Sequence, residues 1–470
     1  MNKLQELVHC LNGHEEKIFR IFLSSPYFNT DASIVNLFEA MLKNRKTEIF
    51  SKQLLFKQLF RNKKYDDKKM RYLVSKLTKH IEYFLTMRHI DKNEPQYLLH
   101  CTEALATKDC EKAFAFAFNE MKRKSPVKNA TQYYLLHKAY ETHLNNTFAK
   151  QPRKIKLDYG NVLQHLDSFY IAKKLQLFCE ITNLKNILSR DYSIHLLAEL
   201  KKLAQHDDFK NIPVVQVYFH VLLTLTEPGN ENHFKALKKS VAQNGHLFPV
   251  NELKELYQYV KNYCIKKINS SRPEYVEILF TIYKEMLADR RLMYDDYFSQ
   301  WEFKNVVNIS LRLNEKEWCK NFIPKYINYL KPSERKNALA FNLAYLHFMN
   351  GNFKEAIKRL KDVEFTDVFY KVDSKVILMK CYYELNEIEF FFYHASAFRL
   401  FLLRNRQLST YQKKMNRNLI IFLSRLVRAG TSSIKIGRLK KEVVEEKNIA
   451  DLNWLLEKIK ENHDVPETFS

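Results

Sequence analysis

Residues 342–357 read NLAYLHFMNGNFKEAI, and the fold class follows from this pattern. Apolar residues at helical spacing stand on both sides of Gly351, which predicts two helices joined by a tight turn. Glycine is scarce elsewhere, with 7 glycines and 11 prolines in 470 residues, whereas average glycine usage is about 7%. Phosphate-binding loops and the tight turns of β-hairpins need glycine. The composition therefore predicts an all-α chain.

The same arrangement returns on both sides of Gly351. Counting 35 residues forward reaches Asn386, and counting 37 residues back reaches Asn314. Apolar residues precede both positions, and the small Cys319 stands where Ala356 stands in the central copy. One helix pair is too small to form its own core, so recurring pairs are expected to bury their apolar faces on one another.

Residues 338–360 resemble a tetratricopeptide (TPR) repeat, whose period is about 34 residues. The segment departs from that pattern at Ala340, where an aromatic residue usually opens the first helix, and it lacks the closing proline. The resemblance implies a TPR-like solenoid of stacked helix pairs. The residues expected to pack the repeats are Leu343, Ala344, Gly351, Phe353, Ala356, Leu378, Tyr382 and Cys319.

Three regions are predicted along the chain. Residues 1–125 are expected to form an N-terminal helical bundle that contains a helix pair at 51–88. Residues 126–430 are expected to form the TPR-like solenoid, because helix-length amphipathic segments alternate there with short polar breaks. Residues 431–470 are expected to form C-terminal helices and a polar tail.

The helix pair at 51–88 has clear boundaries in the sequence. Ser51 is placed to cap a helix over 52–60, and Asp66 and Asp67 favour the start of the next helix. That second helix carries one apolar stripe from Met70 to Leu85 and basic residues on its other face. Helix, turn and amphipathic helix in this order are the outline of a helix-turn-helix.

Residues 52–77 resemble the helical part of the DNA-binding domain in bacterial regulators that carry a repeat-rich activator domain. A winged domain needs a β-hairpin after its second helix, and residues 89–124 show no strand alternation. Two helices that simply pack on each other are therefore the favoured interpretation, and DNA binding is the alternative.

The net charge of +24 is concentrated in two windows. Residues 43–88 contain 14 basic and 4 acidic residues, and residues 390–441 contain 12 basic and no acidic residues. Such windows are typical either of solvated helix faces or of surfaces that bind anions. The candidate anion-binding residues are Lys68, Lys69, Arg71, Lys76, Lys413, Lys414, Arg417, Arg425 and Arg428.

No catalytic, cofactor or metal motif is recognised in the sequence. The Gly-rich phosphate loops and the nucleophile elbow are absent, and no pair of the seven cysteines has the C-x-x-C spacing. The longest apolar run, 214–225, is too short to cross a membrane, and residues 1–6 begin a polar amphipathic pattern. We therefore expect a soluble, cytoplasmic protein without catalytic activity, cofactor or metal.

Two functions are open at this point. The first is a protein-interaction scaffold that holds a protein or peptide partner on a helical-repeat surface. The alternative is a nucleic-acid-associated protein or regulator that uses the windows 43–88 and 390–441. Binding through phosphate contacts must weaken steeply with salt, which separates the two.

Overall fold

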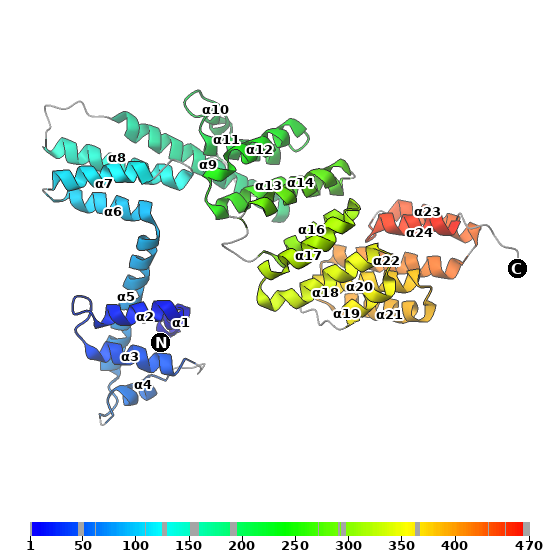
Figure 1. Cartoon of the computed structure of the whole chain (residues 1–470), viewed down its shortest axis with the longest axis horizontal. Coiled ribbons are helices and arrows are strands. Elements are labelled where there is room, and N and C mark those ends of the chain that lie inside the picture. The colour runs from blue at the N-terminus through cyan, green and yellow to red at the C-terminus, as the bar shows by residue number, and fades with distance from the viewer. Residues whose placement is uncertain are drawn as a thin grey trace. The chain divides into compact units, whose positions relative to one another are not determined.

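A computed structural model describes most of the chain and divides it into two compact units, 1–249 and 250–470 (Figure 1). The predicted all-α class is confirmed, because the described residues form α-helices and two short 3-10 helices and contain no strand. None of the described helices is long and apolar enough to cross a membrane. The described residues are 2–45, 51–61, 63–108, 110–124, 129–150, 159–188, 195–270, 272–289, 292, 298–361, 367–430, 432–446 and 448–463.

The first unit contains an N-terminal bundle followed by longer helices. The bundle comprises α1 (Asn2–Cys10), α2 (Gly13–Ser24), α3 (Ala32–Lys43), α4 (Lys52–Leu59) and α5 (Asp67–Lys92). The chain continues through α6 (Glu94–Ala106), α7 (Glu111–Lys124), α8 (Ala130–Lys150), α9 (Tyr159–Leu188), α10 (Leu197–Ala204), α11 (Pro213–Thr226), α12 (Glu231–Asn244) and η1 (Gly245–Leu247).

The second unit is a series of helical hairpins. They comprise α13 (Val250–Asn269) with α14 (Glu274–Ala288), α16 (Gln300–Arg312) with α17 (Lys316–Tyr326) and η2 (Ile327–Tyr329), α18 (Pro332–Met349) with α19 (Phe353–Lys361), and α20 (Val368–Glu384) with α21 (Ile388–Arg404). The last described helices are α22 (Thr410–Ala429), α23 (Ser433–Glu446) and α24 (Leu452–His463).

The N-terminal bundle starts its helices where the sequence places capping residues. Ser51 accepts a hydrogen bond from the backbone N–H of Leu54 and caps α4, and Asp66 accepts one from Lys69 and caps α5. Both predicted helix starts are therefore confirmed. Helices α4 and α5 each pack against α3, and α6 and α7 follow α5 where a winged domain would place its hairpin.

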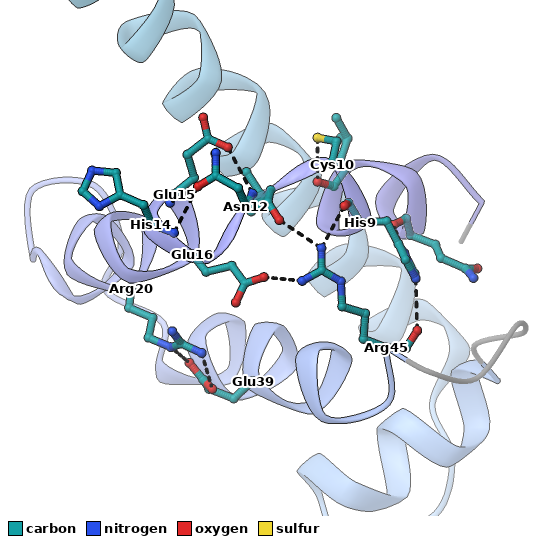
Figure 2. A network of polar contacts seen from close by, with 12 residues as sticks. His9, Cys10, Asn12, His14, Glu15, Glu16, Arg20, Glu39 and Arg45 are labelled. Carbon is teal, nitrogen blue, oxygen red and sulfur yellow. Dashed lines mark hydrogen bonds and ion pairs between the residues drawn. The ribbon is translucent and has the colours of Figure 1, made fainter. Parts of the chain in front are cut away.

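Arg45, in the first basic window, has a structural role (Figure 2). Its guanidinium pairs with Glu16 of α2 and donates hydrogen bonds to the backbone oxygens of His9 (2.8 Å) and Leu11 (2.9 Å). The end of a helix leaves carbonyl groups without partners, and Arg45 satisfies two of them at the end of α1. Nearby, Arg20 of α2 donates to Glu39 of α3 at 2.6 Å. These contacts hold the first three helices together around their apolar core.

Three turns in the second unit share one geometry. Asn314, Gly351 and Asn386 have left-handed backbone angles, with φ of 60°, 75° and 55°. In each turn the next residue donates its backbone N–H to the carbonyl five residues earlier, at 2.9 Å in all three. This is the hydrogen bond of a Schellman motif, which ends a helix on a left-handed residue. The spacing of 35 and 37 residues counted in the sequence therefore locates three equivalent turns.

The hairpins at these turns pack on their neighbours in a regular order. Helix α18 packs against both α16 and α20, and the second helix of each pair, α17 or α19, packs against the first helix of the next. Cys319, Ala356 and Phe391, five residues after the left-handed position, are fully buried in α17, α19 and α21. Each hairpin thus completes its core with its neighbours.

We expect Gly351→Ala to destabilise the second unit by roughly 1–2 kcal/mol, because a left-handed angle costs other residues about that much. A Cβ at this position would meet no atom within 4 Å, so the cost comes from the backbone alone. Gly351→Asn should cost less, since asparagine holds the same conformation at the two equivalent turns. Urea unfolding followed by tryptophan fluorescence reports this unit, which contains all three tryptophans. Equal midpoints for the glycine and alanine proteins would contradict the turn assignment.

Candidate functional site

The predicted repeat-packing residues lie in the hairpins, most of them in the core. Ala344, Ala356 and Cys319 are fully buried, and Tyr382 is buried. Leu343, Phe353 and Leu378 are half-buried, and Phe353 and Leu378 pack against the main core of the unit. Gly351 occupies the turn. Beside these packing residues, the second unit contains a groove.

The groove has a volume of about 850 Å³ and is built from several hairpins of the second unit. Helices α13, α14, α16, α18 and α20 contribute to it, together with the start of α24. A volume of this size fits a segment of polypeptide or a small ligand. The lining residues are Ile265, Ile268, Asn269, Leu279, Tyr283, Asn305, Asn308, Ile309, Arg312, Tyr345, Phe348, Met349, Lys380, Asp451, Leu452, Asn453, Trp454 and Glu457.

The groove combines apolar surface with side-chain amides. Ile309, Tyr345 and Phe348 supply apolar area, while four asparagines on three helices supply groups that both donate and accept hydrogen bonds. Arg312 is exposed in the groove, and no hydrogen bond or ion pair to its guanidinium is found among the described residues. An extended polypeptide offers apolar side chains and unpaired backbone amides, which this combination of groups matches.

Three largely buried lysines form ion pairs between helices of the second unit: the side chains of Lys261, Lys304 and Lys380 are 2%, 12% and 7% exposed. Lys261 of α13 pairs with Glu302 of α16, Lys304 of α16 with Asp373 of α20, and Lys380 of α20 with Asp451, just before α24. The first two pairs join helices that are not adjacent in sequence, and the third joins α20 to the residue that precedes α24. A buried charge is tolerated when it is paired, so these contacts fix the register of the hairpins that line the groove.

Aromatic rings lie beside each of these ammonium groups, with Tyr283 at 5.7 Å from Lys261 and two or more rings near Lys304 and Lys380. The Nζ of Lys304 lies 5.2 Å from the ring centre of Tyr370 and 5.3 Å from that of Phe341. The Nζ of Lys380 lies 4.6 Å from the ring centre of Trp454, in the groove itself. Cation–π contacts add to the attraction of the carboxylates. The sequence analysis did not find these pairs, because each lysine stands among apolar residues in a helical pattern.

Burial changes the pKa of groups in these pairs. It lowers the pKa of Lys261 to about 7. Burial likewise raises the pKa of Asp373 above its ordinary value, against the effect of Lys304. At Asp373 the loss of water around the charge outweighs the effect of its partner.

The stability of the second unit should therefore depend on Lys261 at alkaline pH. Between pH 7 and about 10 the folded state binds fewer protons at Lys261 than the unfolded state does, so stability attributable to this group rises with pH. We expect the stability of Lys261→Met relative to wild type to fall as pH rises from 7 to 9. Urea unfolding at each pH measures it. A difference that is constant with pH would contradict the shift.

Three of the four candidate anion-binding residues of α5 contact side chains of α5 or of the residue that follows α4. Arg71 pairs with Asp67, Lys69 lies 4.1 Å from the ring centre of Phe60, and Lys76 lies 5.3 Å from that of Tyr72. Lys68 is exposed. All four lie on the exposed or half-buried surface of α5, as the stripe pattern predicts.

Two of the C-terminal anion-binding candidates form ion pairs with acidic residues that lie just outside the basic window 390–441. Lys414 pairs with Glu446 at 2.8 Å, and Arg425 makes a two-point contact with Glu442 at 2.5 and 2.8 Å. Both acids belong to α23 and follow the window by a few residues. Arg428 lies 5.1 Å from the ring centre of Phe392. Lys413, Arg417 and Arg428 have no ion pair among the described residues, so these three C-terminal candidates are left for an external anion.

Groups of histidine, cysteine and carboxylate side chains that could hold a metal ion do not occur in the part of the chain that the structure describes. Comparisons of the chain with protein-family profiles, with curated protein sequences and with solved structures found no significant match.

Proposed function

We propose that this chain is a non-enzymatic protein-interaction scaffold, and that the groove of its second unit binds an extended segment of a partner protein. The proposal includes a divergent TPR-like stacking of the hairpins and a cytoplasmic location. It rests on one observation above all. Equivalent hairpins with identical turn geometry, spaced by 35 and 37 residues, contribute their first helices to one groove.

The chemistry of the groove supports a polypeptide ligand. Its asparagines come from α13, α16 and the start of α24, so amide groups are spread along the groove instead of converging on one point. Spread amides suit the repeating N–H and C=O groups of a peptide backbone, whereas a reaction centre gathers its groups around one atom. The buried lysine pairs hold the helices in place, which lowers the ordering cost of binding.

Selection from a displayed peptide library against the full chain tests the proposal. The enriched peptide should bind the wild-type protein in solution, and Asn308→Trp should weaken it by at least about tenfold, because a bulky side chain then fills the groove. Lys320→Trp, on the exposed side of α17, is the matched control and should bind normally. The groove would be refuted as a peptide site if Asn308→Trp left the affinity for the enriched peptide unchanged. It would also be refuted if the selection enriched no peptide.

A second candidate function is association with nucleic acid through the basic windows. The observation in its favour is that Lys413 and Arg417 of α22 lack acidic partners among the described residues. On this hypothesis the helix-turn-helix-like pair α4 and α5 would also bind nucleic acid, with the exposed Lys68 contacting a phosphate. This is the weaker proposal, because Glu442 and Glu446 already neutralise two neighbouring cations.

We expect the charge reversals Lys413→Glu, Lys414→Glu and Arg417→Glu together to abolish salt-sensitive retention on a phosphate-rich matrix, with helicity unchanged. Each phosphate contact makes binding fall with salt, and reversal removes three cations. Column retention at several salt concentrations and circular dichroism measure the two effects. If the wild-type protein is not retained at low salt, the window is only a solvated face.

A further inference from the structure

Helix α21 is apolar on both of its faces. Its inner face buries Phe391, Ala395, Phe398 and Leu402 in the core of the unit. Its outer face exposes large apolar side chains, with fractional exposures of 60% for Phe390, 79% for Tyr393, 45% for Leu400 and 65% for Leu403. These four residues, which we call the α21 stripe, recur at helical spacing along one side. Surface helices normally carry polar residues on that side.

The equivalent helices of the preceding hairpins do not share this property. Seven residues after the left-handed turn position, α17 has Asn321 and α19 has Lys358, both exposed, whereas α21 has Tyr393. The outer positions of α19 also include Lys354 and Arg359. Among α17, α19 and α21, an apolar outer face is therefore specific to α21 and not a consequence of how the hairpins are built.

Unpaired cations border the α21 stripe. Arg399 and Arg404 lie on α21 and Arg406 follows it, all three exposed. Among the described residues none of these arginines forms an ion pair, and residues 390–441 contain no acid that could supply one. The nearest acids after that window, Glu442 and Glu446, pair with Arg425 and Lys414. The surface thus combines exposed apolar area with positive charge that has no partner within the described fold.

We propose that the α21 stripe binds an amphipathic helix of a partner protein whose apolar face is flanked by aspartate or glutamate. The stripe runs from Phe390 to Leu403, which is about 20 Å at 1.5 Å per residue and matches one helix of a partner. Flanking carboxylates would pair with Arg399, Arg404 and Arg406. This surface is separate from the groove, because no groove residue belongs to α21.

The charge and the side-chain types of the α21 stripe argue against three other binding partners: a second copy of this chain, a nucleic acid and a membrane. A second copy of this chain would bring two arginine-bordered stripes together, and like charges across an interface repel. Phe390 and Tyr393 offer rings to a nucleic-acid base, but Leu400 and Leu403 do not, whereas all four side chains match the apolar face of a helix. An anionic membrane matches the charge, but the stripe occupies a single packed helix and fits the width of one helix–helix contact.

A displayed library of helices of about 18 residues tests the proposal, a length that covers the stripe. Its apolar positions vary among Leu, Ile, Phe and Met at helical spacing, and its flanks are fixed as Glu. Selection uses the full chain. We expect an enriched helix to bind with roughly micromolar affinity and to bind at least about tenfold more weakly when its apolar positions are scrambled.

Two double variants locate the binding. Tyr393→Ser with Leu403→Ser, and Arg399→Glu with Arg404→Glu, should each weaken the enriched helix by at least about tenfold, since they remove the anchors or the charge complement. Lys358→Glu, on the equivalent face of α19, is the matched control and should bind normally. The groove variant Asn308→Trp should also bind normally, which separates this proposal from that of the groove.

Three results would overturn the inference. Enrichment of no helix, or equal binding of the scrambled helix, would show that the stripe does not recognise an amphipathic partner. Binding of the wild-type chain to phosphatidylserine-containing vesicles, lost in both double variants while no helix is enriched, would assign the surface to a membrane.

Discussion

At pH 6, Glu302→Met is expected to destabilise the second unit by about 1–3 kcal/mol, because the ammonium group of Lys261, still charged below its lowered pKa, is left buried without its carboxylate. The side chain of Lys261 is 2% exposed, so water cannot replace the lost partner. Glu302 also accepts a hydrogen bond from Gln258 at 3.1 Å, and this amide would lose its acceptor as well. Urea unfolding followed by tryptophan fluorescence measures the loss.

The reverse truncation should behave differently. Lys261→Met removes the buried charge and leaves Glu302, which is partly exposed and keeps its contact with Gln258, so we expect a change near zero. The double variant should recover most of the stability that Glu302→Met loses. If Glu302→Met is tolerated as well as Lys261→Met, the pair does not hold α13 and α16 in register.

Ala356→Trp is expected to cost about 1–3 kcal/mol or more, since it overpacks the contact between α19 and its neighbours. Ala356 is fully buried, and a tryptophan side chain has no space there without moving a helix. Lys358→Trp, two residues along on the exposed side of α19, adds the same fluorophore and should be close to neutral. Equal stabilities for the two variants would show that the register of the hairpin is wrong.

The helix caps and the turns of the hairpins could be predicted from the sequence, because a single residue at each position determines whether the helix starts or ends there. Ser51 and Asp66 cap their helices as expected, and Asn314 and Asn386 lie at the turns that counting from Gly351 assigns to them, where the structure shows a left-handed backbone. These features depend on local backbone hydrogen bonds. Local chemistry can be derived from a few neighbouring residues.

The buried ion pairs were not predictable for the opposite reason. Lys304 and Asp373 are far apart in sequence and meet only when the hairpins pack, and a lysine in an apolar stripe usually extends to water. The same limit applies to the C-terminal window. Its sequence contains no acid, yet Glu442 and Glu446 fold back onto Arg425 and Lys414. Counting charges along a chain does not reveal which charges meet in space.

Part of the groove could be predicted from the sequence and part of it could not. Ala356 and Gly351 mark the hairpins that build it, and they are visible in the sequence. Its lining was not, because Asn269, Arg312 and Trp454 come from three helices whose proximity depends on tertiary packing. The proposed peptide site is therefore recognised only in the three-dimensional structure, whereas the fold class can be recognised from the sequence.

Hydrogen–deuterium exchange of the full chain, with and without a peptide enriched by selection, tests the scaffold proposal most directly. The account predicts slower exchange in α16, α18 and the start of α24, where the groove lies, because bound backbone and side chains reduce local opening. The outer helices α17 and α19 should exchange as before. Protection confined to those outer helices or to the first unit, with α16 and α18 unchanged, would contradict the account.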